Sequence, residues 1–527
     1  MKIPVAQVGE VGLVTDQPHH ELPLNAWTDA NNVRFRDGAA EKFSGHVEVF
    51  QGVLWSPEWL MAAQYGGLAF WLYASGNKVG AVDGLNHSDI TRAVGGDYTM
   101  NPATGWTGAT IEDIPVINNG FDVPQQWKYP ALATRLQNLE NWPATLRAST
   151  IRVLKRYLVA LDITKEGTRF PNTIKWSSES PSGAVPLSWD ENDETNDAGE
   201  WTLPGAGGFL VDAHPMRDVL ILYKERQTWQ MQFVGTAAGV FRFSRIFGNI
   251  GTLARRCAVE FFSGQHFVFT CEDAIVHDGQ NAKSIMSERA RHMLQDTIDQ
   301  TNYNKSFVVV NYATSDVWAC YPEVGQTYPT RALVWNWEKN RWGERDLPKI
   351  SFIDSGLVSP QSATDTWAGA TATWATATKI WGDRASDPTK QKMLMASPTD
   401  TKLYVPEIGQ SVNGQPMESF VERQGIGWPL KAEAPPDYTR MKQVTAIWPR
   451  VTGTQGGVIN VYLGTQEKIG GPVNYGPAQT FVIGETEFCD FADSETARIH
   501  AVKFESNTDI SWRLSGYDAD VIDRGEH

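Results

Sequence analysis

Short β runs separated by turn residues recur along most of this chain, and this pattern constrains the fold more than any other feature. Runs such as LAFWLYA (68–74), YLVALD (157–162), VLILY (219–223) and FVVVNY (307–312) are apolar or alternating and are bounded by turn residues. Aromatic side chains, which favour strands, are abundant: Trp 21, Tyr 15 and Phe 22. Repeated over several hundred residues, this spacing predicts an all-β propeller or sandwich and argues against a βαβ sheet.

Three segments have the form of strand–turn–strand pieces of propeller blades: 219–235, 266–280 and 331–348. No Trp-Asp or kelch signature recurs at a fixed period, so the sequence leaves the number of blades open. Helical spacing is clear only at 284–300, where Ile285, Leu294 and Ile298 predict one face of a short helix.

The expected fold is therefore mainly β: a β-propeller with a platform domain built as a β-sandwich or barrel, and one or a few short helices. We expect an N-terminal platform segment at 1–45, the propeller at 46–430, and the C-terminal sandwich part of the platform at 431–527, after a Pro-rich step. Two loop insertions are expected in the propeller. The one near 177–208 is rich in Pro, Gly and acidic residues, and the one near 359–383 carries Trp367, Trp374 and Trp381 at intervals of seven.

The charge balance, the cysteines and the N-terminal sequence argue against a DNA-binding, an exported or a membrane-spanning protein. Among 527 residues, Lys and Arg number 46 and Asp and Glu 61, so the formal net charge is 46 − 61 = −15, which makes sequence-specific DNA binding by the whole chain unexpected. The four cysteines are scattered without a Cys-x-x-Cys pair, which favours reduced thiols made in a cytoplasm. The first residues lack the apolar core of a signal peptide, and the longest apolar run, 68–74, is too short to span a bilayer.

A search for catalytic motifs yields no candidate. Gly-x-Ser-x-Gly and the phosphate-binding Gly-x₄-Gly-Lys are absent from the sequence. The His19-His20-Glu21 triplet does not continue to His-Glu-x-x-His, because position 24 is Leu24. The acidic stretch 190–197 departs from a calcium loop, which needs Gly and Glu where Thr195 and Trp201 stand. We therefore expect no enzyme activity, no catalytic residues, no cofactor and no metal site.

Two local basic groups stand out against the acidic background. Arg255 and Arg256 follow a glycine-rich turn, and Arg289, Arg291 and His292 lie in the expected helix. Either group could contact a DNA backbone or an acidic neighbour. The simpler interpretation, which we favour, is that they are exposed faces of a turn and of a helix.

The segment 20–45, HELPLNAWTDANNVRFRDGAAEKFSG, resembles the N-terminal motif of tail proteins in short-tailed phages. The residues that carry the resemblance are Glu21, Leu22, Pro23, Trp27, Asp29, Asn32, Val33, Arg34, Phe35, Asp37, Gly38, Lys42 and Gly45. Further segments similar to that family include LILYKERQTWQMQFVG, GNIGTLARRCAVEF, HFVFTCEDAIVHDG, the expected helix and the Trp-repeat loop. The family is the tail nozzle or hub, also called tail tubular protein B or phage stabilisation protein.

This resemblance implies a structural virion protein rather than a particular chemistry. It implies a homo-hexameric ring, built from a platform and a β-propeller, below the portal and the head-to-tail adaptor ring. Such a ring extends the DNA channel, retains the genome until ejection, and carries tail fibres or tailspikes, with a tail needle or plug as a further partner. It is assembled in the host cytoplasm, passes double-stranded DNA without sequence-specific binding, and has no stable membrane insertion. We expect its contacts to bury surplus exposed aromatic side chains.

The residues leave one other class open and argue against another. A polysaccharide-binding or polysaccharide-cleaving propeller component of the tail needs only two well-placed carboxylates or stacking aromatics, and 61 acidic residues neither exclude nor localise such a site. A trimeric fibre or spike would need a long repetitive shaft, which this sequence lacks.

Overall fold

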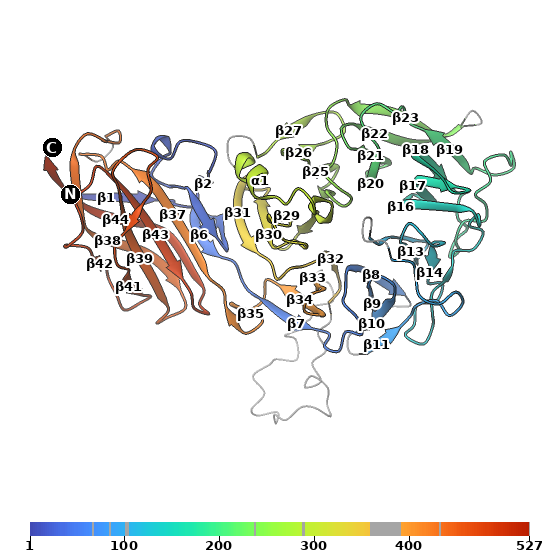
Figure 1. The fold of residues 1–527 in the computed structure, drawn as a ribbon, viewed down its shortest axis with the longest axis horizontal. Coiled ribbons are helices and arrows are strands. Elements are labelled where there is room, and N and C mark those ends of the chain that lie inside the picture. Colours follow the sequence, from blue (N-terminus) through green and yellow to red (C-terminus); the bar gives the residue numbers. More distant parts are fainter. Residues whose placement is uncertain are drawn as a thin grey trace, which may run out of the picture.

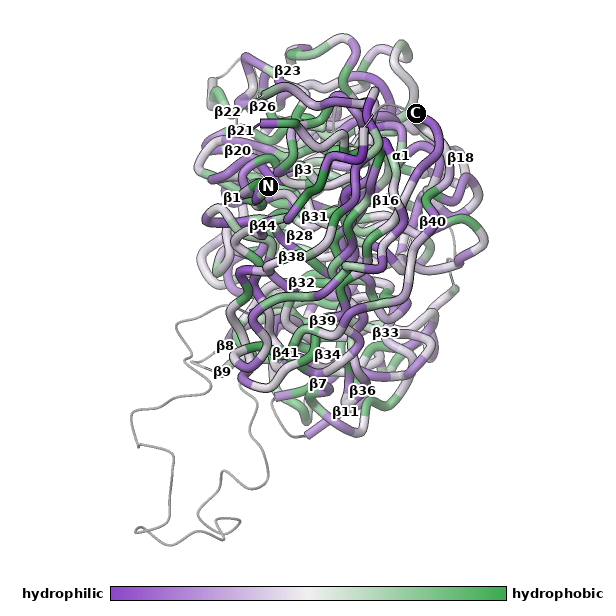
Figure 2. The backbone as a smooth tube through the Cα atoms, turned by 90° about the vertical axis from the view of Figure 1, so that its left-hand side faces the viewer, coloured by the Kyte–Doolittle hydropathy of each residue, from purple (hydrophilic) through white to green (hydrophobic). Residues whose placement is uncertain are grey.

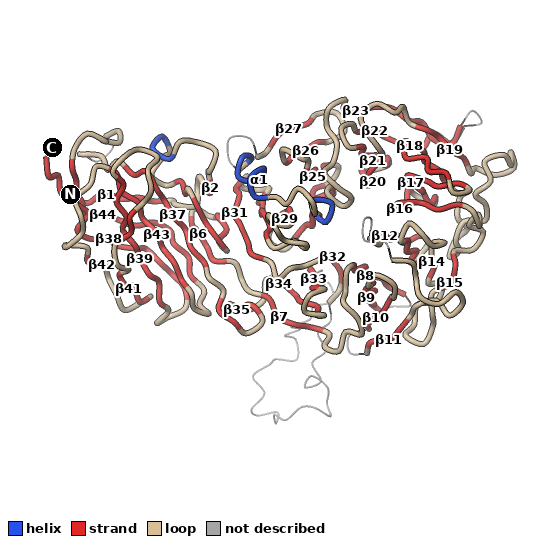
Figure 3. Tube along the Cα trace, viewed as in Figure 1, coloured by secondary structure: helices blue, strands red, loops and turns tan. Residues whose placement is uncertain are grey.

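The computed structural model describes residues 1–65, 68–83, 86–100, 105–236, 239–286, 290–358, 392–431 and 434–525. Two bodies lie side by side, a β-sandwich that holds both termini and a larger ring of small sheets (Figure 1). Strands dominate both bodies, and helix is limited to short turns (Figure 3). The mainly β fold expected from the sequence is confirmed.

The ring is a β-propeller with seven four-stranded blades in the described residues. Within each of blades 1 to 6 the strands follow chain order from the innermost to the outermost, as an antiparallel meander. Blade 1 contains β8 (Trp59–Tyr65), β9 (Leu68–Ala74), β10 (Val79–Val82) and β11 (His87–Asp89); blade 2 contains β12 (Thr107–Ile111), β13 (Ile114–Asn118), β14 (Gln125–Gln126) and β15 (Gln137–Asn138); blade 3 contains β16 (Leu146–Leu154), β17 (Tyr157–Lys165), β18 (Thr168–Trp176) and β19 (Gly199–Thr202). Blade 4 contains β20 (Leu210–Met216), β21 (Val219–Lys224), β22 (Thr228–Thr236) and β23 (Gly239–Phe247); blade 5 contains β24 (Ala258–Phe262), β25 (Gln265–Phe269), β26 (Ala274–His277) and β27 (Ala282–Ser284); blade 6 contains β28 (Phe307–Asn311), β29 (Asp316–Tyr321), β30 (Arg331–Asn336) and β31 (Arg341–Asp346).

Blade 7 closes the ring with strands from two distant parts of the chain. Its three inner strands are β32 (Phe352–Gly356), β33 (Lys392–Ser397) and β34 (Lys402–Pro406), and its outermost strand is β7 (His46–Val49). β7 pairs antiparallel with β34, with Leu403 opposite Val49 and Pro406 opposite His46. A short hairpin, β35 (Ser411–Val412) and β36 (Gln415–Pro416), extends this sheet. The ring is therefore closed by β7, which enters the propeller from the platform and pairs with β34.

Each pair of neighbouring blades encloses its own apolar cluster, so the core of the propeller is divided among the seven blade interfaces. Aromatic side chains fill several of these interfaces. Between blades 2 and 3, for example, Trp142 meets Trp189 edge-on with ring centroids 4.6 Å apart. Hydrophobic segments are accordingly spread through the whole body (Figure 2).

The platform is a sandwich of two mainly antiparallel sheets. One sheet contains β1 (Lys2–Ala6), β5 (Val33–Arg36), β6 (Ala39–Lys42), β38 (Met441–Gly453), β42 (Cys489–Asp490) and β44 (Trp512–Gly525); the other contains β4 (Asp29–Asn31), β37 (Ser419–Ile426), β39 (Val458–Gln466), β40 (Asn474–Tyr475), β41 (Gln479–Val482) and β43 (Ile499–Ser506). A parallel pair, β2 (Gly12–Leu13) and β3 (Ala26–Trp27), lies beside them. One buried cluster, which includes Trp27, Phe504 and Tyr517, fills the space between the two sheets.

The platform and the propeller share a continuous sheet. β5 of the platform pairs with β31, the outermost strand of blade 6, where Val33 lies opposite Glu344. The chain returns to the platform at β37, which pairs with β43. The platform part therefore begins near Ser419, earlier than the boundary expected at residue 431, because β37 completes the second sheet.

The helix and the insertions differ from the expectations in detail. The helix α1 covers only Arg291–Thr297, since Ser284 ends β27 opposite Ile275 and Ile298 is extended. None of the helices in the described part of the chain is long and apolar enough to cross a membrane.

The segment 177–208 is not a surface loop alone. It contains β19, the outermost strand of blade 3, and it buries Val185 and Trp189 in the core between blades 2 and 3. The insertion expected at 359–383 lies outside the described residues, which resume at Lys392 in β33.

Candidate functional site in the propeller channel

The innermost strands of the seven blades surround a central channel. A cavity of about 370 Å³ in this channel is lined by residues from every innermost strand: Trp59, Thr107, Arg152, His214, Ala258, Val309 and Ile353 are examples in blade order. Its wall is mixed, with apolar strand residues interrupted by a few charged ones. These charged residues are the groups at the centre of the propeller that could bind a ligand.

Asp212 is the centre of a charge cluster in this wall. Its carboxylate lies 2.7 Å from Arg152 Nη2 and 3.3 Å from His214 Nε2, and it accepts the backbone N–H of Arg256 at 2.8 Å. The Arg152 guanidinium and the His214 ring lower the pKa of Asp212 far below its usual range, against the opposing effect of burial. Asp212 is therefore a fixed anion that ties blades 3, 4 and 5 together.

Asp354 forms a second bridge across the channel wall. Its Oδ2 accepts the backbone N–H of Ala62 at 3.1 Å, and its Oδ1 accepts the backbone N–H of Ser355 at 2.9 Å. Burial raises the pKa of Asp354 to about 6. This carboxylate therefore joins blade 7 to blade 1, the last and the first blades along the chain.

Arg255 and Arg256 also point into the channel rather than outward. They form the turn before β24, and their side chains line the smaller cavity described next. The expectation that they are the exposed face of a turn is therefore wrong. Arg255 and Arg256 face inward because a connection that leads into an innermost strand lies beside the axis of the propeller. The sequence signal that could have located them is this place just before the first strand of a blade.

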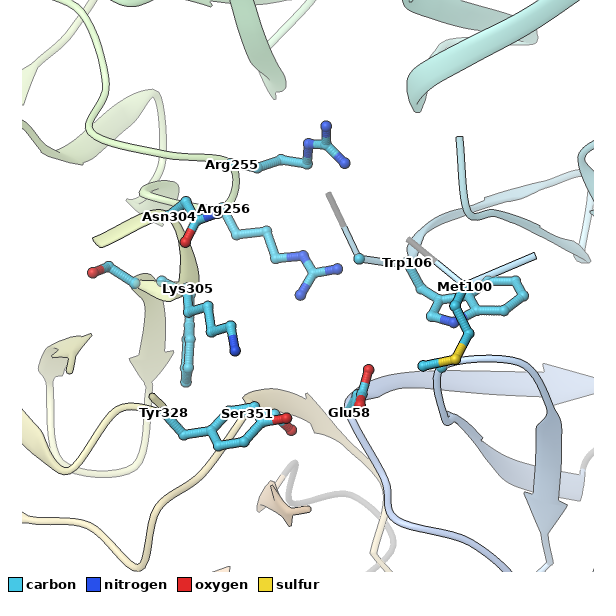
Figure 4. Close-up of a pocket in the computed structure, with 13 residues that line it drawn as sticks. Glu58, Met100, Trp106, Arg255, Arg256, Asn304, Lys305, Tyr328 and Ser351 are labelled. Atoms are coloured by element: carbon cyan, nitrogen blue, oxygen red, sulfur yellow. The ribbon is translucent and has the colours of Figure 1, made fainter. Parts of the chain in front are cut away.

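The smaller cavity, of about 140 Å³, lies where several innermost strands begin. Arg255, Arg256 and Lys305 extend into it from blades 5 and 6, and Glu58, Tyr328, Met100 and Trp106 lie around it (Figure 4). Arg256 lines both cavities, so it marks the boundary between them.

The other groups singled out in the sequence have structural partners. Arg291 pairs with Asp273, and the backbone N–H of Arg291 donates to Asp16 Oδ2 at 2.7 Å, whereas Arg289 lies outside the described residues. In the acidic loop, Glu191 pairs with Lys165 and Lys175. No group of three or more His, Cys, Asp or Glu residues within the described ranges is arranged to hold a metal ion.

Several motif residues of 20–45, among them Asn32, Val33 and Arg34, lie where the platform meets the propeller. Asn32, in a left-handed conformation with φ 54°, donates through its amide to Asp346 Oδ2 at 2.8 Å and to the Glu418 carbonyl at 2.7 Å. Its amide oxygen accepts the Asp346 N–H at 2.9 Å. Trp27 Nε1 donates to the Val8 carbonyl at 2.6 Å inside the sandwich. The motif therefore serves folding and joins the two bodies.

A buried ion network completes this junction. The Glu407 carboxylate, on the connection after β34, binds the guanidinium groups of Arg34 and Arg345. Arg345 is 1% exposed, stacks over Trp318 at 4.7 Å, and donates to the Gly45 carbonyl at 3.1 Å. Arg34 Nη1 also lies 3.6 Å from Asp316. Buried ion pairs thus join blades 6 and 7 to the platform.

Comparisons with known proteins bear on the fold alone. No family model matches the chain, and no curated protein sequence matches it significantly. Solved structures that resemble it include the WD40 β-propeller domain of Doa1 (TM-score 0.38, 9% identity, 69% of this chain and 96% of that chain) and YCF48 bound to D1 peptide (TM-score 0.35, 7% identity, 69% and 94%). Raptor of Chaetomium thermophilum is similar at a TM-score of 0.38 and 8% identity, over 69% of this chain and 30% of that chain.

Proposed function

We propose that this chain is the subunit of a hexameric tail nozzle or hub of a short-tailed phage. In this role it extends the DNA channel below the portal and the adaptor ring, retains the genome, allows its ejection, and anchors tail fibres or tailspikes. It acts as a structural part of the virion tail, assembled in the host cytoplasm, and not as an enzyme.

The observation that carries this proposal is the position of the motif residues. Asn32, Arg34 and Gly45, which resemble the family motif, lie at the joint between a β-sandwich and a β-propeller. A platform joined to a propeller is the architecture that the resemblance implies. The motif and the architecture therefore both support the assignment to a tail nozzle.

The charge of the chain is compatible with a DNA conduit. Six copies would carry 6 × −15 = −90 formal charges. An acidic or mixed wall avoids the counterion release that binds DNA to basic surfaces, so DNA could slide past it.

An apolar surface between blades 3 and 4 supports assembly into a ring. Trp201 is 52% exposed and stacks flat on Phe243, with centroids 5.8 Å apart and 4° between the planes. Phe209, 48% exposed, lies beneath the Arg169 guanidinium at 5.5 Å. Exposed aromatic side chains of this kind are enriched in protein interfaces. We assign this surface to the contact between neighbouring copies in the ring.

Genome retention provides the test. Particles assembled without this chain should package DNA and then lose it, and purified chain added before the loss should restore retention. The measurement is the DNA content of purified particles over time. Particles that retain DNA without the chain but no longer bind or cleave host polysaccharide would contradict the proposal and favour a polysaccharide-directed tail component.

A further inference from the structure

In the smaller channel cavity, hydrogen bonds to two neighbouring blades hold the backbone of Arg256. Arg256 adopts a left-handed backbone conformation, with φ 66°. Its N–H donates to Asp212 Oδ2 at 2.8 Å, and its carbonyl accepts the N–H of Val308 at 2.8 Å. Because blades 4 and 6 each hold one backbone group, the side chain is directed into the channel. A left-handed conformation at a non-glycine residue persists only where surrounding contacts impose it.

Among the described residues, no carboxylate pairs with the Arg256 guanidinium where it ends in the cavity. It lies over the Phe352 ring, 4.3 Å from the centroid. Its Nη2 atom is buried and has no hydrogen-bond partner among the described residues. A buried, unsatisfied charged donor is costly, so the position favours any ligand that supplies an acceptor.

Two further cations face the same small space. Arg255 donates through Nη2 to Ser149 Oγ at 2.7 Å, and Lys305 Nζ lies 4.2 Å from the centroid of the Tyr328 ring. Burial, followed by the neighbouring arginines, lowers the pKa of Arg256 to about 9, and burial lowers the pKa of Arg255 to about 10. Burial also lowers the pKa of Lys305. Like charges removed from water repel one another, and a bound anion would relieve this repulsion.

The nearby carboxylates only partly offset these charges. Asp212 is committed to Arg152 and His214, and Asp354 to the backbone of Ala62 and Ser355. Glu58 lines the small cavity itself, and burial raises the pKa of its carboxyl, so it gives up its proton less readily than an exposed glutamate. Within the described residues, Arg256 forms no ion pair with any carboxylate at 4.0 Å or less, in contrast to Arg152.

We propose that this cavity binds a small tetrahedral oxyanion, phosphate or a phosphate monoester, through Arg256 and Lys305. A volume of about 140 Å³ accommodates such a group but not a nucleic-acid duplex. The adjoining cavity of about 370 Å³ leaves room for the remainder of a small phosphorylated molecule. This site belongs to each single chain and does not depend on assembly into a ring.

Isothermal titration of the purified full-length chain with sodium phosphate, at ionic strength held constant with sodium chloride, tests the site. The wild-type chain should bind phosphate saturably with one site per chain. Arg256→Gln should weaken binding at least tenfold, since it removes the uncompensated charge. Arg242→Gln, at an exposed position of the outermost strand β23, is the matched control and should bind as the wild type does.

Two further variants keep the test decisive if Arg256→Gln fails to fold. Lys305→Gln should weaken phosphate binding, and Glu58→Gln should strengthen it, because the first removes attraction and the second removes repulsion. Opposite shifts from two residues that face one cavity would not arise from a general loss of structure. Equal affinity in all three variants, or an absence of saturable binding, would overturn the proposal.

The choice of anion distinguishes the two sources of phosphate. Tighter binding of glucose 6-phosphate than of phosphate would identify a small phosphorylated molecule, and equal or weaker binding would identify free phosphate. Acetate that binds as well as phosphate does would overturn the tetrahedral assignment.

Discussion

The charge network at the junction gives the most quantitative prediction. Glu407→Gln keeps the shape of the side chain but removes the carboxylate that lies between Arg34 and Arg345. These two guanidinium groups are 8% and 1% exposed at the side chain, so neither can recover its hydration by a small movement. The substitution therefore leaves the buried Arg345 without its carboxylate and Arg34 with Asp316 alone.

The expected loss follows from this burial. Removing one partner of a buried ion pair costs about 3–5 kcal/mol, which is a large part of the roughly 5–15 kcal/mol that stabilises a folded domain. An unfolding entropy of about 2.1 cal/mol/K per residue gives about 1 °C per kcal/mol for 527 residues, so the melting temperature should fall by roughly 3–5 °C. Differential scanning calorimetry and guanidinium unfolding, followed by tryptophan fluorescence, both measure this loss.

The matched control removes an exposed ion pair at the edge of the platform. Glu10, whose side chain is 60% exposed, lies 3.1 Å from Arg341. Glu10→Gln should cost less than about 1 kcal/mol, since water screens this pair. The account of the junction would be refuted if Glu407→Gln cost no more than Glu10→Gln.

A double-mutant cycle separates the pair from the packing around it. Arg345→Met and Glu407→Met should each be strongly destabilising, because each leaves a buried charge. The double variant should lose less than the sum of the two by at least about 1 kcal/mol. Additive losses would show that the two groups do not depend on each other.

Three further predictions concern assembly, pH and a close backbone contact. Trp201→Ala, which removes an exposed ring, should leave the melting temperature within about 1 °C but reduce the hexamer fraction in sedimentation velocity; an unchanged fraction would exclude this surface from the ring contact. Burial lowers the pKa of His266 to about 3 and of His277 to about 4, so both rings are neutral in the folded protein. In the unfolded chain the two rings have the ordinary histidine pKa of about 6.5, so below that pH the unfolded chain binds more protons than the folded protein. Stability should therefore be complete above pH 6.5 and fall as the pH drops toward 4, by up to about 1.4 kcal/mol per pH unit for each ring; a flat urea midpoint between pH 7 and 4.5 would contradict this. Gly45→Ala would place a Cβ 1.8 Å from the Ser411 carbonyl oxygen and should prevent stable closure of blade 7, whereas Gly205→Ala, with open space around it, should unfold within about 0.5 kcal/mol of the wild type.

The strands were predictable because their signal is local. Alternation of apolar residues between turns identified the hairpins at 219–235, 266–280 and 331–348, and each is present as two paired strands. The closure of blade 7 was not predictable, since β7 and β34 pair across more than 350 residues and β7 is only four residues long. Pairing at such separation leaves no periodic trace in either segment.

The site was less predictable than the fold for a related reason. Arg255 and Arg256 have the sequence context of an exposed turn, and only the ring of blades turns that position toward the axis. Trp189 stands in an acidic, turn-rich segment, yet it is 2% exposed because it packs on Trp142 from blade 2. In both cases the deciding partner comes from another blade.

Electron cryo-microscopy of the tail vertex, in the virus that encodes this chain, tests the central claim most directly. The proposal predicts six copies around the DNA channel, between the adaptor ring and the distal tip, with fibres or spikes attached to them. A peripheral position at three copies per appendage would contradict it and make the chain a receptor-binding component.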